Sequence, residues 1–220
     1  MRKPAFVIAI AAATLASPAL ATTTNIDLSG ATSGTTIVAP GGSFSQTFTG
    51  QTVSGATGIS GSPAGPLGLT AAGTIFVADF NPGVSPDSNS LLSQPDNQGP
   101  LSVLLDTLAD SFTFTMGSSD AGSTIDVRAF DAFGALTGST TITMLSNYNI
   151  YNLSGLGTFK GLTFFNNNDG AGVRFQNMSY NSVGGAVPEP ATWAMMLIGF
   201  GAIGLTLRRR RASGELALAA

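Results

Sequence analysis

The chain is 220 residues long, of which 43% are hydrophobic and only 10% charged, and it contains no histidine and no cysteine. These absences exclude a Ser-His-Asp triad, a cysteine nucleophile, a disulfide framework and a zinc site with His or Cys ligands. Residues 22–187 hold three basic and ten acidic residues, a net charge of −7, and this surface repels phosphate backbones, so we predict no nucleic-acid partner.

Residues 1–21 have the layout of a secretory signal peptide. Two basic residues precede an apolar stretch over 5–16, and a small-x-small cleavage site follows at Ala19 and Ala21. A helix of that length reaches about 18 Å, which is short of the roughly 30 Å of a bilayer core. We therefore predict cleavage by signal peptidase and a mature protein that begins at Thr22; the alternative is an uncleaved N-terminal anchor.

Residues 22–186 form the predicted exported domain, and its first half is rich in Gly, Ser, Thr and Pro. Two stretches, 43–49 and 74–80, have the composition of strands. The sequence between them, over 58–68, predicts a turn-rich connection. Residues 81–100 contain four prolines, which interrupt strand pairing, so we expect a long loop there.

The second half alternates apolar and polar residues with period two, which is typical of half-buried strands. Strands are predicted over 110–116, 124–130, 135–143, 149–153, 159–165 and 171–180. The side chains expected to point inward are those of Phe112, Phe114, Met116, Ile125, Val127 and Ala129. A hairpin turn is expected over 131–134. Strands at intervals of roughly ten residues favour an all-β, jelly-roll-like β-sandwich.

Residues 187–211 combine a proline-flanked glutamate, an apolar span and a cluster of arginines. The two prolines favour extended backbone and hold Glu189 exposed. The span over 191–207 carries no charge and reaches about 25 Å as a helix, which predicts one short transmembrane helix. Arginines are costly to move into hydrocarbon, so the cluster would keep the C-terminus in the cytoplasm. The residues that carry this pattern are Pro188, Glu189, Pro190, Trp193 and Ala194, followed by Arg208, Arg209, Arg210 and Arg211.

This arrangement resembles the PEP-CTERM sorting domain in its PEPxxWA variant. The resemblance implies recognition of the tripeptide by an exosortase, an integral-membrane, transpeptidase-like enzyme of Gram-negative bacteria. It also implies an inner-membrane intermediate and then delivery to the cell-envelope surface or to the exopolysaccharide matrix of a biofilm. Residues 212–220 depart from the family pattern, whose tails end soon after the arginines, and we expect them to form a cytoplasmic extension. The alternative is a plain membrane anchor with the same topology.

The exported domain is similar in rhythm to ectodomains that are common among PEP-CTERM proteins. The two blocks that carry this similarity cover residues 111–139 and 159–181. Those ectodomains look like jelly-roll modules akin to carbohydrate-binding domains. The similarity therefore implies a sandwich fold and makes exopolysaccharide a candidate partner.

Four aspartates are candidate calcium ligands, because jelly-roll modules often hold one structural calcium: Asp120, Asp126, Asp131 and Asp169. The tract over 166–170 also offers oxygen ligands, but an EF-hand loop would need Asp or Asn in place of Phe165. Asn and Gly tolerate positive φ, so this tract is predicted to be a hairpin turn. Solvated turn carboxylates are the favoured interpretation of the four aspartates. No cofactor is predicted, and calcium stays open as the alternative.

Three tyrosines, with the neighbouring Asn147 and Asn149, could form a platform that stacks on sugars: Tyr148, Tyr151 and Tyr180. Ordinary packing at strand edges is the favoured competing interpretation. An enzyme is not predicted, because glycoside hydrolysis uses a pair of carboxylates and the domain has no glutamate and few close aspartate pairs. The leading prediction is an exported structural protein of the envelope or matrix. The alternative is a carbohydrate-binding module for the cell's exopolysaccharide.

Overall fold

The computed structural model describes residues 21–79, 89–93, 98–117, 121–170, 172–183 and 196–200. Residues Ala21–Val183 form one compact unit, and the two chain ends make up the other. Residues 1–20, the Pro-Glu-Pro motif, the arginine cluster and Asp120 lie outside the described residues, whereas a short helical segment is described over 196–200. No helix in the described part of the chain is both long and apolar enough to cross a membrane; most of the span expected over 191–207 lies outside that part.

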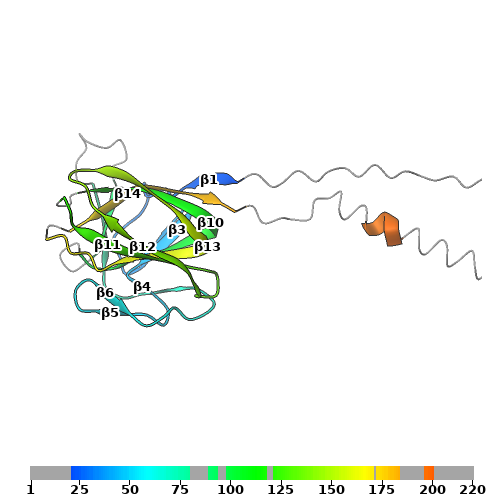
Figure 1. Cartoon of the computed structure of the whole chain (residues 1–220), viewed down its shortest axis with the longest axis horizontal. Helices are drawn as coiled ribbons and strands as arrows, with labels where there is room; N and C mark the ends of the chain where they lie inside the picture. Colours follow the sequence, from blue (N-terminus) through cyan, green and yellow to red (C-terminus); the bar gives the residue numbers. More distant parts are fainter. Residues whose placement is uncertain are drawn as a thin grey trace, which may run out of the picture. The chain divides into compact units, whose positions relative to one another are not determined.

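The compact unit is built around one large antiparallel sheet (Figure 1). The main path of this sheet runs β12-β11-β13-β10-β14-β9-β8. These strands are β8 (Ile75–Asp79), β9 (Asn89–Ser93), β10 (Leu101–Gly117), β11 (Thr124–Phe130), β12 (Leu136–Thr143), β13 (Asn149–Phe165) and β14 (Arg174–Ser182). Three more strands join them: β1 (Thr22–Asn25) pairs with β14, and β2 (Ile37–Ala39) pairs with β3 (Gly42–Ser45), which in turn pairs with β10. The predicted all-β class is confirmed.

Strand β10 joins the two layers of the sandwich, because its two halves have different neighbours on one edge. Residues 102–105 pair with β3, and residues 109–117 pair with β14, while β13 follows the other edge along nearly the whole strand. The register shifts between Leu104 and Ser111 mark the bend. Bulges of this kind let a strand turn a corner and continue in the second sheet of a sandwich. The expected sandwich is therefore confirmed.

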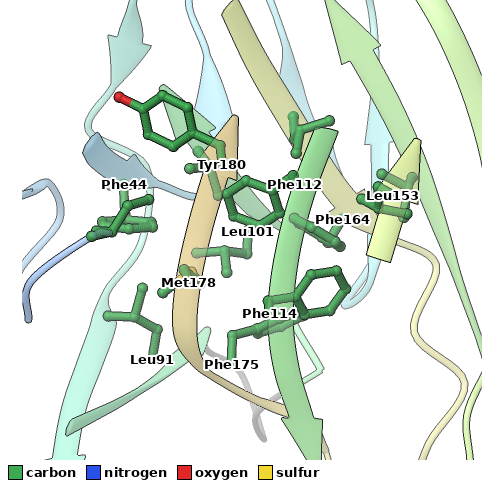
Figure 2. Close-up of a cluster of buried hydrophobic side chains, with 14 of the residues drawn as sticks. Phe44, Leu91, Leu101, Phe112, Phe114, Leu153, Phe164, Phe175, Met178 and Tyr180 are labelled. Carbon is green, nitrogen blue, oxygen red and sulfur yellow. The ribbon is translucent and has the colours of Figure 1, made fainter. Parts of the chain in front are cut away.

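The main core lies between the layers and is rich in phenylalanine (Figure 2). The ring centroids of Phe114 and Phe164 are 5.2 Å apart, and those of Phe164 and Phe175 are 5.0 Å apart. Edge and tilted contacts at these distances are the favoured aromatic geometries. All six side chains that were expected to point inward are buried, so the period-two prediction is confirmed for β11 and for the second half of β10.

Residues 46–70, which we call the outer segment, pack against the opposite face of the sheet. They contain two short ladders, β4 (Thr47–Phe48) with β7 (Leu69–Thr70) and β5 (Thr52–Ser54) with β6 (Gly58–Ser60), drawn in cyan in Figure 1. A second apolar cluster joins this segment to the sheet: Phe48, Leu67 and Phe130 are buried in it. A Cβ on Gly161 would come within 2.5 Å of the Phe48 ring and 2.8 Å of Leu67. Phe48 and Leu67 of the outer segment can therefore pack directly on the sheet because Gly161 has no side chain.

Two predictions of strand boundaries are wrong. Residues 149–153 and 159–165 belong to one strand, β13, rather than to two. Gly155 and Gly157, with φ of 75° and 78°, lie in a bulge of this strand opposite Asp110. The loop expected over 81–100 contains β9, whose Leu91 is fully buried opposite Phe175. Prolines flank this strand, so they bound it and do not prevent it.

The tract over 166–170 is not a hairpin turn. Strands β13 and β14 lie on opposite sides of β10, so the chain between them crosses from one edge of β10 to the other. Asn166 has a positive φ of 53°, a conformation that asparagine tolerates, as the sequence suggested. Here this conformation starts the crossover and does not form a hairpin turn.

Phe114→Ala should lower the free energy of unfolding by about 3–5 kcal/mol, because it removes a fully buried ring that touches several others. Phe133→Ala is the matched control, since 77% of the Phe133 side chain is exposed. Chemical denaturation of the purified chain measures both. Equal losses in the two variants would contradict the assignment of the core.

Candidate functional site

An open pocket of about 380 Å³ lies on the face of the sheet that points away from the main core. It forms where β11, β12 and the end of β13 meet. Its lining residues are Asp126, Val127, Arg128, Ser139, Thr140, Thr141 and Phe165. Its volume falls within the range of small-molecule sites, about 300–1,000 Å³.

The alternation of β11 explains which side chains reach this pocket. Ile125, Val127 and Ala129 are buried in the main core, so the side chains between them point to the opposite face. The register then brings partners from both neighbouring strands. Thr141 and Phe165 stand on either side of Asp126, and Ser139 stands opposite Arg128. The pocket therefore follows from the cross-strand register as much as from the local sequence.

The carboxylate of Asp126 is held by two side-chain hydrogen bonds. The Thr141 hydroxyl donates to Oδ1 at 2.7 Å, and the Asn166 amide donates to Oδ2 at 2.8 Å. Asn166 is itself fixed, because its backbone N–H donates to the carbonyl of Thr57 in the outer segment. A carboxylate accepts about four hydrogen bonds, so each oxygen of Asp126 can accept another from a ligand.

The guanidinium of Arg128 lies over the ring of Phe165, with its Cζ 4.6 Å from the ring centroid. This cation–π contact orients the side chain without using any of its five N–H donors. Among the described residues, the guanidinium forms no ion pair and no hydrogen bond. Arg128 is also one of only three basic residues in the domain. The guanidinium of Arg128 thus presents oriented N–H donors two residues along β11 from the fixed carboxylate of Asp126.

The chemistry of this pocket suits binding rather than bond cleavage. Its charged lining is one carboxylate and one guanidinium, so the two formal charges cancel. The hydroxyls of the exposed residues Ser139 and Thr141, which stand opposite Arg128 and Asp126, supply further hydrogen-bonding groups. A single carboxylate cannot provide the pair of groups that glycoside hydrolysis uses.

The candidate calcium ligands occupy separate environments. Oδ1 of Asp131 accepts hydrogen bonds from the backbone N–H groups of Phe133 and Ala135, and this closes the turn between β11 and β12, as expected. Asp169 is fully buried in the crossover after β13. In the part of the chain that the structure describes, no three acidic side chains form a group able to hold a metal ion. The absence of a cofactor stays a prediction, with calcium as its alternative.

The three tyrosines do not form one platform. Tyr180 is buried in the main core, and Tyr151 stacks on Phe114 with its hydroxyl accepting from the N–H of Leu145 at 2.9 Å. Tyr148 packs closely over Gly117, where a Cβ would come within 2.3 Å of its ring. The packing interpretation holds for these side chains. Sequence reasoning missed Arg128 and Phe165, because their contact depends on the register between β11 and β13.

Residues 186–211 match the family model of the PEP-CTERM protein-sorting motif, which confirms the resemblance found in the tail. No curated protein matches the chain. Among solved structures, a mutant of CBM29-2, a family 29 carbohydrate-binding module, is 15% identical with a TM-score of 0.37, over 78% of this chain and 99% of that one. The enzymatically active domain of tailspike protein 4 from bacteriophage CBA120 is 14% identical with a TM-score of 0.32, over 49% of this chain and 17% of that one. Scores this low do not establish a shared fold.

Asp131→Ala should destabilise the domain by about 1–2 kcal/mol, because two backbone N–H groups in the β11–β12 turn lose their acceptor. Asp110→Ala serves as its control, since the exposed Asp110 accepts a hydrogen bond from the hydroxyl of its neighbour Ser111 and closes no turn. Thermal unfolding of the two variants checks the difference. An Asp131 variant as stable as the Asp110 variant would argue against this role for the carboxylate.

Proposed function

We propose that this chain is an exported structural protein of the cell envelope or exopolysaccharide matrix, delivered there by exosortase processing at Pro188-Glu189-Pro190. The observation that carries the proposal is the match of residues 186–211 to the PEP-CTERM sorting motif. Signal peptidase removes residues 1–21, and the apolar span over 191–207 then holds the protein in the inner membrane. Arg208–Arg211 stop that span, and processing by the exosortase releases the domain from it.

The arrangement of the domain's two ends supports this processing scheme. Strand β1 begins at Thr22 and pairs with the end of β14, and the Thr22 and Ser182 hydroxyls are 2.6 Å apart. The compact unit ends at Val183, five residues before the tripeptide. Both expected cleavage sites therefore lie in sequence just beyond the folded unit. The domain can be complete before either end is processed.

A second candidate function is carbohydrate binding, and the pocket over β11 and β12 favours it. A carboxylate with spare acceptor capacity, a guanidinium with unused donors and the hydroxyls of Ser139 and Thr141 face the same space. Sugar-binding sites need this combination, because each sugar hydroxyl both donates and accepts. The two functions are compatible, since a matrix protein can bind the polymer around it.

Glu189→Ala should leave the protein in the membrane fraction of the native host, whereas the unmodified protein leaves it. The variant keeps the apolar span but lacks the acidic side chain of the recognised tripeptide. Glu215→Ala is a close control, because Glu215 is the only other glutamate and lies beyond the arginines. Cell fractionation followed by immunoblotting distinguishes the variants. Release of the Glu189 variant at the normal level would overturn the sorting proposal.

Calcium should not raise the melting temperature of the purified chain over its value in chelator. Both carboxylate oxygens of Asp126 and Oδ1 of Asp131 accept hydrogen bonds from protein donors, and no three of the described acidic side chains converge. Differential scanning calorimetry with calcium, magnesium or chelator measures this. A rise of several degrees with calcium alone would instead assign a structural calcium, with Asp120 and Asp169 as the first ligands to test.

A further inference from the structure

We propose that the pocket over β11 and β12 binds a neutral polysaccharide, with Asp126 and Arg128 recognising adjacent hydroxyls of one sugar residue. This inference rests on the carbohydrate-binding candidate and goes further by naming the ligand class and the residues that select it. It is independent of the sorting tail.

Charge favours a neutral polymer over an acidic one. The carboxylate and guanidinium of the pocket cancel, so it offers no net attraction for a uronate, sulfate or phosphate. The surrounding domain has a net charge of −7, and such a field repels a polyanion as it approaches. A neutral sugar chain needs no net charge in the pocket and is not repelled by the negative charge of the domain.

The hydrogen-bonding groups match a pair of adjacent hydroxyls. Asp126 accepts hydrogen bonds from the ligand's hydroxyl groups, and Arg128 donates hydrogen bonds to their oxygen atoms. Both are charged, and hydrogen bonds to charged groups are stronger than those between neutral groups. Ser139 and Thr141 add hydroxyls along the same strip of β12. The site can therefore satisfy donors and acceptors of a sugar together.

The two central side chains are held in place by protein contacts. Thr141 and Asn166 fix the carboxylate, and the ring of Phe165 supports the guanidinium. Fixing these groups in advance reduces the conformational entropy lost when a ligand binds. Phe165 is only 4% exposed, so it acts as a support for Arg128, and the guanidinium is what faces the ligand.

The test uses the full chain purified in a detergent whose headgroup is not a sugar, since a glucoside or maltoside would compete. Isothermal titration calorimetry against dextran, mannan and a soluble β-glucan covers the neutral class, and alginate covers the acidic class. We expect saturable binding to at least one neutral polymer and none to alginate. Asp126→Asn and Arg128→Gln should each weaken that binding about tenfold or more, as expected for loss of a charged hydrogen-bonding group.

Two further variants make the result specific to the pocket. Asp110→Asn removes a carboxylate elsewhere on the exposed surface and should bind like the unmodified chain. Arg128→Lys keeps the charge but loses the planar fork, and it should bind less tightly than the unmodified chain. Circular dichroism and the melting temperature of each variant show whether it is folded.

Each other outcome overturns a defined part of the proposal. Binding to alginate alone overturns the neutral class. Binding to a neutral polymer that folded Asp126→Asn and Arg128→Gln leave unchanged means that the domain binds carbohydrate at another surface. Binding to no polymer overturns both this inference and the carbohydrate-binding candidate. The sorting proposal is then untouched, because fractionation of the Glu189 variant decides it separately.

Discussion

Strand β10 pairs with two different strands along one edge, and this double pairing holds the two layers of the domain together. Its first half pairs with β3 and its second half with β14, while β13 follows it on the other edge. The strand therefore joins the two layers and places Phe112 and Phe114 between them. Pairing of Leu101 with Phe164 also fixes the end of β13, and with it the position of Phe165 beneath Arg128. The main core and the pocket therefore both depend on the position of β10.

The two faces of the sheet have different roles. One face builds the phenylalanine-rich core, and the other carries the outer segment at one end and the polar pocket beside it. The two regions meet at Asn166, whose backbone N–H donates to the carbonyl of Thr57 and whose side-chain amide donates to Asp126. Binding chemistry on this face is consistent with a domain that has no histidine or cysteine and only three basic residues. Such a domain can recognise a polymer through fixed hydrogen bonds.

Strand predictions from the sequence were most accurate for strands that have one buried face and one solvated face. Residues 124–130 were expected as a strand and form β11, because each alternate residue there has a distinct environment. Residues 101–105 were missed, since they are covered on both faces and lack alternation. For the pocket, Asp126 could be named from the sequence but only as a calcium candidate. Its partners Arg128, Thr141 and Phe165 come together through strand register, which local patterns do not encode.

The sorting tail gives the clearest functional statement, and the folded domain is arranged so that both of its ends leave from paired strands. Processing of the chain after export therefore decides whether this tail is a sorting signal. The most direct measurement is the intact mass of the protein recovered from envelope and matrix fractions of the native host. Removal of the signal peptide and processing by an exosortase should leave a species that begins at Thr22 and lacks Arg208–Ala220. A predominant species that still ends at Ala220 would contradict it.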